Sequence, residues 1–373
     1  MFSDRFRWDA RPNRLTQLLR ARRRAGAQVL DLTESNPTRA GLRYPPEILR
    51  AFADPRILAY DPTPAGMFEA REAVAAYYAA RGVAVDPSRI LLTASTSEAY
   101  AYLFKLLTNP GDHVLVPRPS YPLFEFLAAM ESVEVRQYPL HCHGGWSIDL
   151  ETLAASVTDR TRAIVIVNPN NPTGSFLKRS ELEFLLRLHV PLISDEVFGD
   201  YAFGPDRARV TTLAGTGFTM SGLSKIAGLP QMKLGWIVVQ GAEAMEKLEW
   251  IADTYLSVST PVQCAATRLL AAGLDVQRQI RVRTAQNLAM ARETLAGSAA
   301  GVLTVEGGWC ATLQMPRVHS EEEWALSLLE LDGVLVQPGF FYDFETEAFL
   351  VVSLLTESEI FREGLRRIRT HVE

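Results

Sequence analysis

The chain has 373 residues, of which 47% are hydrophobic and 22% are charged, and its net charge is −5. This length exceeds one compact core and predicts a large domain with a smaller one attached. The acidic balance argues against a nucleic-acid partner, and no stretch approaches the roughly 20 apolar residues of a membrane span. The charged start of the chain has no signal-peptide pattern, and the three cysteines lack a zinc or disulfide spacing. We therefore expect a cytoplasmic protein with reduced thiols.

Short apolar runs alternate with helix-period segments between about residues 65 and 260. In the segment 70–78 apolar residues recur at i, i+3, i+4, i+7 and i+8, and the segment 99–107 repeats this spacing. The alternation predicts an α/β fold with a mainly parallel sheet between helices. The runs expected as strands are Leu115–Pro117, Ala163–Val167, Pro191–Ser194, Phe218–Met220 and Ile237–Val239.

A long charged helical segment, Val262–Ala296, follows the predicted sheet, and a helix at Glu357–Ile368 closes the chain. We interpret residues 45–272 as the large domain. Residues 1–44 and 273–373 are expected to combine, from the two ends of the chain, into a smaller α+β domain.

Polar groups follow four predicted strands, Ile90–Thr93 and three of those above, at the positions where ligands bind in open α/β sheets. Ser95 and Glu98 have the spacing of a helix capping box, and a helix start attracts anions. Asn171 stands in a turn made rigid by prolines, Asp195 directly follows a buried strand, and Lys225 lies among small residues. Each feature alone is compatible with an ordinary cap, turn or surface charge, so the order of the four carries the prediction.

With these four features in this order, the chain resembles the fold-type I enzymes that depend on pyridoxal 5′-phosphate (PLP), specifically the class I/II aminotransferase family. The similarity extends over nearly the whole sequence. The matching motifs are Tyr60 with Gly66, Pro110-Gly111-Asp112, Ser120-Tyr121-Pro122, Asn171-Pro172-Thr173-Gly174, Asp195-Glu196-Val197, Ser224-Lys225 and Gly235-Trp236.

The resemblance implies roles for the residues around the coenzyme ring. Lys225 would form the internal aldimine with PLP and later move the proton at the substrate carbon. Asp195 would pair with the pyridinium nitrogen and keep it protonated. Asn171 would donate to the phenolate oxygen of the ring, and Tyr121 would stack on the ring face.

The resemblance also implies how the PLP phosphate is held and how two subunits pair. Ser95 and Thr96 would bind the phosphate at the helix start, with Ser224 and Lys233 as further contacts. Tyr60 matches a residue that reaches the phosphate of the neighbouring subunit. The resemblance therefore implies a homodimer with shared active sites.

Two positions near the coenzyme depart from the family pattern. Phe198 stands where a tyrosine usually donates to the phenolate oxygen, which leaves Asn171 as the main donor. We expect an internal aldimine that favours its protonated form more than usual. Lys233 replaces an arginine, which keeps the charge and loses the bidentate fork.

The third departure concerns the substrate. Val351 occupies the place of the arginine that usually clamps the substrate α-carboxylate, and no arginine lies between Arg317 and Arg362. Ser35 and Asn36 stand where a glycine-containing turn lines the substrate site, and with Asn171 they are the predicted substrate contacts.

This departure leaves two interpretations open. The substrate lacks a free α-carboxylate, as an amine, a carbonyl compound or an esterified or carrier-bound acid does. Alternatively another cation replaces the arginine, with Arg39, Arg43 and Arg118 as the candidates. We predict poor transamination of common free α-amino acids such as aspartate.

The leading prediction is a PLP-dependent aminotransferase that acts on a small amino donor and a carbonyl acceptor. A PLP-dependent lyase of the same fold is the alternative, because substrate orientation sets which bond breaks. A PLP-binding sensor without catalysis would need a partner protein, since no DNA-binding segment precedes Asp31. His141 and His143 lack further ligands, so we expect no metal site.

Overall fold

A mainly parallel sheet of eight strands forms the centre of the computed structural model, which describes residues 3, 5, 8, 11–204, 217–346 and 348–373. Most of residues 1–10, the charged start, therefore lie outside the described part. Neighbouring strands among β8, β7, β6, β3 and β4 are parallel, whereas β9 and the edge strand β5 run antiparallel to their neighbours. This confirms the predicted sheet, and each expected strand falls in it. The order is β2 (Ile90–Thr93), β9 (Gly235–Val239), β8 (Gly217–Gly222), β7 (Leu192–Asp195), β6 (Thr161–Val167), β3 (His113–Arg118), β4 (Glu134–Cys142) and β5 (Trp146–Ile148).

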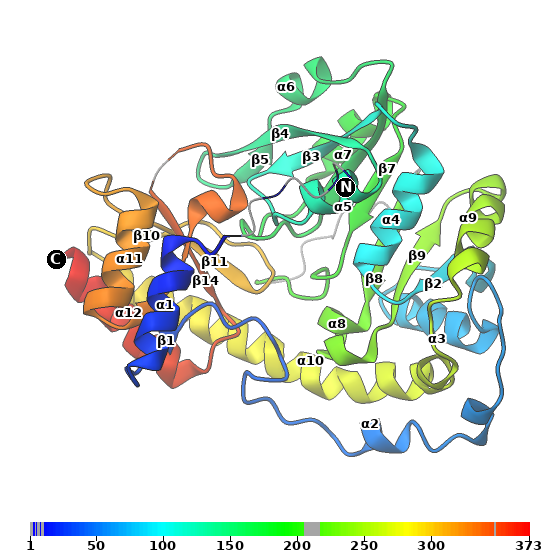
Figure 1. Cartoon of the computed structure of the whole chain (residues 1–373), viewed down its shortest axis with the longest axis horizontal. Helices are drawn as coiled ribbons and strands as arrows, with labels where there is room; N and C mark the ends of the chain where they lie inside the picture. The colour runs from blue at the N-terminus through cyan, green and yellow to red at the C-terminus, as the bar shows by residue number, and fades with distance from the viewer. Residues whose placement is uncertain (1–2, 4, 6–7, 9–10, 205–216, 347) are drawn as a thin grey trace.

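Helices cover both faces of this sheet (Figure 1). Leu91 and Leu92, adjacent in β2, belong to different apolar cores, because successive side chains of a strand point to opposite faces. Leu103 and Leu248 pack on one face and Val74 packs on the other. The helices are α3 (Phe68–Ala79), α4 (Thr96–Leu107), α5 (Phe124–Met130), α6 (Leu150–Ala155), α7 (Arg179–Arg187), α8 (Leu223–Ile226) and α9 (Ala242–Tyr255), with α2 (Glu47–Arg50) and the 3-10 helices η2 (Pro55–Leu58), η3 (Pro87–Arg89) and η5 (Pro230–Met232).

A second, smaller core joins the two ends of the chain. Leu15 and Leu30 from the N-terminal segment pack with Leu328 and Leu365 from the C-terminal segment. Strand β1 pairs in parallel with β12, and a four-stranded sheet in the order β10-β11-β14-β13 lies beside them. The division at residues 44 and 272 stays a prediction. The elements are α1 (Arg14–Arg24), β1 (Leu30–Asp31), β10 (Gly301–Val302), β11 (Cys310–Gln314), α11 (Glu321–Leu331), β12 (Val334–Leu335), β13 (Gln337–Pro338), η6 (Gly339–Tyr342), β14 (Phe349–Ser353) and α12 (Ser358–Val372).

Helix α10 (Thr260–Leu295) connects the two cores, as the long yellow helix in Figure 1 shows. Ala265 and Leu269, near its start, pack with α3, whereas Leu288 and Leu295, near its end, pack in the smaller core. Within the described residues, no helix combines the length and the apolar character that crossing a membrane requires.

Candidate active site

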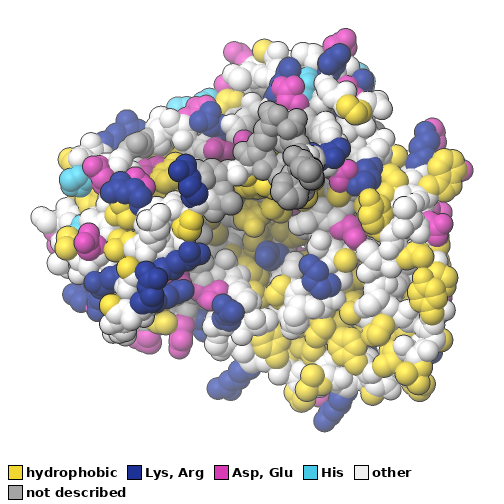
Figure 2. Space-filling view, viewed as in Figure 1, with side chains coloured by type: hydrophobic (Ala, Val, Ile, Leu, Met, Phe, Trp, Pro, Cys, Tyr) yellow, Lys and Arg dark blue, Asp and Glu magenta, His cyan; other side chains and the backbone are white. Residues whose placement is uncertain are grey.

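A cavity of about 470 Å³ lies at the C-terminal ends of the central strands, where the two parts of the molecule meet. Figure 2 shows a hollow on the corresponding face. The large part contributes most of the lining, and β11, β13 and β14 close the other side. The described polar and aromatic residues that line it are Thr33, Ser35, Ser95, Thr96, Ser97, Tyr100, Tyr121, Phe124, Asn171, Asp195, Phe198, Ser224, Lys225, Lys233, Trp309, Cys310, Gln337, Tyr342 and Ser353.

Part of the cavity lining offers hydrogen-bond donors and positive charge that suit an anion. Ser95 is the N-cap of α4, and its hydroxyl accepts a hydrogen bond from the Glu98 N–H at 3.2 Å. Because the first N–H groups of a helix lack intrahelical partners, the start of α4 presents donors and a positive dipole. Lys233 and Ser224 line the same cavity. A phosphate is the group that these donors and this charge suit best.

Asp195, the last residue of β7, puts a carboxyl group into the cavity. The Tyr100 hydroxyl donates to its Oδ2 at 3.2 Å, and the Val197 N–H donates to its Oδ1 at 3.2 Å. Burial raises the pKa of Asp195 from 3.8 to about 6, and the two hydrogen bonds and Lys225 only partly oppose this shift. A buried carboxylate of this kind is stabilised by a cationic partner.

Lys225 extends from the four-residue helix α8 into the same cavity. Burial lowers the pKa of its amine, and Asp195 acts in the opposite direction. The amine nitrogen lies 5.7 Å from the ring centre of Phe198 and 5.4 Å from that of Trp309. A lysine whose pKa is lowered in this way has more of its amine in the neutral, nucleophilic form.

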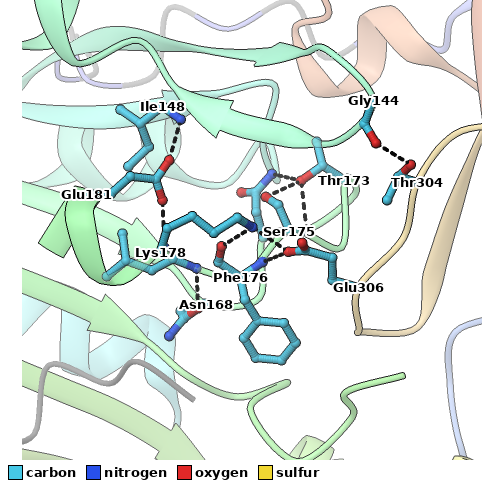
Figure 3. Close-up of polar contacts among 12 residues, drawn as sticks. Gly144, Ile148, Asn168, Thr173, Ser175, Phe176, Lys178, Glu181, Thr304 and Glu306 are labelled. Carbon is cyan, nitrogen blue, oxygen red and sulfur yellow. Dashed lines mark hydrogen bonds and ion pairs between the residues drawn. The ribbon is translucent and has the colours of Figure 1, made fainter. Parts of the chain in front are cut away.

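Asn171 belongs to the loop of residues 168–178 between β6 and α7. Side-chain hydrogen bonds, including those around Thr173 and Ser175, fix this loop (Figure 3). The Asn170 amide donates to the Pro119 carbonyl and to the Thr173 hydroxyl, at 3.0 and 2.9 Å. Glu306, from the smaller part, accepts from the Phe176 N–H at 2.8 Å. The loop is thus tied to both parts of the molecule.

The Glu306 carboxylate also forms an ion pair with Lys178 at 2.6 Å, which strengthens the connection between the loop and the smaller part (Figure 3). Asn171 itself is partly exposed, and its side-chain oxygen is buried without a hydrogen-bond partner in the part of the chain that the structure describes. An amide held rigidly with unused hydrogen-bonding capacity is suited to a ligand.

Most of the residues predicted from the sequence lie around this one cavity. Asn36 and Tyr60 are not among its lining residues. The Asn36 side chain instead accepts hydrogen bonds from the N–H and hydroxyl of Thr38, and Tyr60 is 74% exposed beside a separate hollow. The predicted residues found in the lining are Ser35, Ser95, Thr96, Tyr121, Asn171, Asp195, Ser224, Lys225 and Lys233.

The three arginines considered as substitutes for the missing clamp do not line the cavity. Arg39 and Arg43 are exposed. Arg118 donates to the Asp343 carbonyl at 2.8 Å and pairs with Glu345 at 3.3 Å. Among the described residues, the cations that line the cavity are Lys225 and Lys233.

The described residues that the smaller part contributes to the cavity wall are uncharged. Val351, in β14, is buried and faces Thr312 on one neighbouring strand and Gln337 on the other. The Tyr342 hydroxyl donates to the Gln337 side-chain oxygen. Burial raises the pKa of the neighbouring Cys310 thiol to about 12, so this group is also neutral.

Sequence reasoning missed several of the lining residues, among them Tyr100 and four from the C-terminal third of the chain. Tyr100 lies one helical turn after Thr96, and this spacing from the anion-binding helix start could have identified it. The other four come from three separate stretches of the C-terminal third, and their approach to the cavity depends on how that part folds back. They are Trp309, Cys310, Gln337 and Tyr342.

Comparison with known proteins identifies the fold and the family. The fold is shared with the structure of an alanine aminotransferase from Pyrococcus furiosus, with a TM-score of 0.89 and 23% identity over 100% of this chain and 99% of that one. A family model described as aminotransferase class I and II matches residues 27–368. The chain belongs to this family.

Two curated relatives indicate the range of the family. Tyrosine aminotransferase of Mus musculus is 28% identical over 293 residues, which cover 71% of this chain and 64% of that protein. Glutamate-pyruvate aminotransferase AlaA of Escherichia coli (strain K12) is 32% identical over 265 residues, which cover 64% of this chain and 63% of that protein. The matches thus span less than two thirds of the length of these relatives.

The residues present fit the coenzyme that the family implies. PLP carries a ring nitrogen that can be cationic at one end and a phosphate at the other, and the cavity offers a buried carboxylate and an anion-binding helix start. A Cβ at Gly235 would lie 3.0 Å from the Thr93 hydroxyl and 3.1 Å from the Ser95 carbonyl carbon. The glycine therefore permits the close backbone packing that shapes the phosphate end.

Proposed function

We propose that this protein is a PLP-dependent aminotransferase with its reactive lysine at Lys225. The observation that supports the proposal most is the combination of Lys225 and Asp195 in one cavity with the start of α4. Bound PLP supplies an electron sink that stabilises negative charge at the substrate carbon. Lys225 would attach the coenzyme and then hold and move the proton at that carbon.

The remaining residues of the large part would orient the coenzyme. Asp195 would keep its ring nitrogen protonated, and the Tyr100 hydroxyl would hold that carboxylate in place. Asn171 would donate to the ring oxygen, and Tyr121, 47% exposed at the cavity, would cover the ring face. The phosphate would be held by Ser95, Thr96, Ser224 and Lys233.

We further propose that the substrate places an uncharged group against the wall of the smaller part. Gln337, Tyr342 and Ser353 offer neutral hydrogen-bonding groups there. A free carboxylate held between these groups without a cation would lose its hydration at a cost of several kcal/mol. Ser35 lines the cavity and would contact the substrate. Asn36 would instead stabilise the turn beside Ser35 through its hydrogen bonds with Thr38. An amine, a carbonyl compound or a masked acid fits this wall.

The working form would be a homodimer. Large apolar side chains are exposed on one region of the surface, over α2, α3 and α9 (Figure 2). Exposed apolar surface of this kind marks protein contacts. Tyr60 would reach across to the phosphate in the second copy. The exposed apolar side chains of this region are Leu49, Leu58, Tyr60, Phe68, Trp250 and Tyr255. We also propose that the protein is located in the cytoplasm.

The test is a panel of amino donors added to the purified protein that has been loaded with PLP. Transamination would convert the absorbance of the lysine-bound coenzyme into that of pyridoxamine phosphate, with no release of ammonia. The panel includes free α-amino acids, their amides and esters, and simple amines. Release of ammonia and a keto acid would instead identify a lyase. Protein that stays colourless with PLP, and yields no borohydride-trapped adduct on Lys225, would overturn the proposal.

A further inference from the structure

The backbone that carries Lys225 is held by side chains from distant parts of the chain. The Tyr201 hydroxyl donates to the carbonyl of Lys225 at 2.6 Å, and the Gln277 amide donates to the carbonyl of Ile226 at 2.6 Å. Helix α8 has only four residues, too few to fix its own conformation through internal hydrogen bonds. The position of the lysine backbone therefore depends on these tertiary contacts.

The two donors are themselves immobilised. Tyr201 is 1% exposed, and its ring packs edge-on against Trp309 at 5.2 Å between centres. The Gln277 amide also donates to Asp200 at 2.8 Å. Arg81 holds the Asp200 carboxylate with two hydrogen bonds, at 2.8 and 2.9 Å. A buried network of this kind stays rigid because each polar group has partners.

Helix α10 lies unusually close to the segment that follows Lys225. A Cβ at Gly273 would lie 2.3 Å from the Cβ of Ala227, and one at Gly228, where φ is +61°, would lie 2.7 Å from Val276. Both glycines are required for this approach. The contact brings Gln277 within reach of the Ile226 carbonyl.

We propose that Tyr201 and Gln277 are positioning residues, which hold the backbone of α8 so that the Lys225 amine projects into the cavity beside Asp195. The proposal rests on the proposed function, in which Lys225 is the reactive amine. Tyr201 belongs to the segment after β7, and Gln277 belongs to the helix that joins the two parts of the molecule. The lysine is thus held in place from two directions.

The test measures the pKa of the Lys225 amine in the protein without coenzyme. The rate at which the amine reacts with acetic anhydride is followed against pH, and labelling at Lys225 is read by peptide mass spectrometry. The titratable groups that act on this amine are Asp195 and Cys310, and burial lowers its pKa. In Tyr201→Phe and Gln277→Leu the amine would move from its buried position, and its pKa would rise by about 0.5–1 unit.

Activity gives a second measurement. Displacement of the lysine would lower kcat on the order of 10-fold and change KM by less than about twofold, because the substrate contacts are intact. Tyr201→Phe keeps the packed ring and removes only a hydroxyl, so it is the variant least disturbed in folding.

Asn287→Leu is the matched control. Asn287 is a buried amide on the same helix, and it donates to the carbonyls of Leu354 and Thr356 at 2.9 and 2.7 Å. The Asn287→Leu substitution should lower the melting temperature and leave the pKa of Lys225 unchanged. Equal melting losses in all three variants with no change in that pKa would overturn the proposal. The labelling needs no coenzyme, so it decides the role of Tyr201 and Gln277 even if PLP fails to bind and the proposed function is wrong.

Discussion

The two sides of the cavity differ in charge. The large part contributes Asp195, Lys225, Lys233 and the positive start of α4, whereas the lining that β11, β13 and β14 contribute is neutral. Charges placed at both ends of one side would fix the orientation of a coenzyme that is itself charged at both ends. Neutral hydrogen-bonding groups on the other side would select the substrate. The class of reaction and the choice of substrate are therefore expected to respond separately to mutation.

The largest effect is expected for Lys225→Ala on the charged side. Without the amine there is no attachment for PLP and no base at the substrate carbon, so amino transfer should fall on the order of 10⁴-fold. The measurements are single-turnover kinetics and borohydride trapping. Lys233→Ala is the control, since it should weaken PLP binding by about 10-fold and still yield the adduct.

Asp195→Asn should reduce turnover on the order of 10²-fold, because a neutral amide does not hold the ring nitrogen protonated. Its effect on stability has the opposite sign. In the protein without PLP, burial raises the pKa of Asp195 from 3.8 to about 6, so the folded state holds this proton more tightly than the unfolded state. The ionised Asp195 carboxylate destabilises the folded state. This destabilisation is absent below about pH 4 and complete above about pH 6.

Urea unfolding of the coenzyme-free protein checks this sign. Asp195→Asn should be more stable than the wild type by about 3 kcal/mol at pH 8 and nearly equal to it at pH 4. Asp275→Asn, an exposed position on α10, is the control and should change neither stability nor turnover. A wild type that is stabilised by raising the pH from 4 to 8, relative to Asp195→Asn, would contradict the assignment.

Val351→Arg tests the neutral side. Residues 351 and 353 of β14 point to the same face, and Ser353 lines the cavity, so a long side chain at 351 could reach it. The guanidinium would bind a free carboxylate with two hydrogen bonds and raise kcat/KM for free α-amino acids by about 10-fold. Val351→Met, with similar added bulk and no charge, is the control. Rapid turnover of aspartate with 2-oxoglutarate by the wild type would contradict the claim that the neutral side of the cavity disfavours a free carboxylate.

The smallest effect is expected for Phe198→Tyr. Phe198 is buried at the cavity and packs edge-on against Trp309 at 5.3 Å between ring centres. A hydroxyl there would donate to the ring oxygen of bound PLP and disperse its charge. The pH at which the visible absorbance of the holoenzyme changes should fall by about one unit. A wild type whose absorbance already changes in the mildly acidic range would contradict the reasoning.

The sequence predicted the sheet and the long helix because both depend on local pattern. Ala163–Val167 and Ile237–Val239 are continuous apolar runs, which fit strands covered on both faces. The segment 262–296 has a helical pattern without an internal proline, and α10 spans nearly the same residues. The bounds of strand β4 were not predicted, because its exposed and half-buried residues lack a clear apolar run.

For the site, the sequence by itself determined which chemistry is available: an amine, a carboxylate, an amide and a helix start, each at or shortly after the end of a strand of one mainly parallel sheet. Such strand ends meet at one edge whatever the details of packing, so their side chains come together. Only the tertiary structure decided what faces them. Trp309, Gln337 and Tyr201 reach the cavity or the lysine backbone through contacts between elements far apart in the chain, and such contacts leave no periodic trace in the sequence.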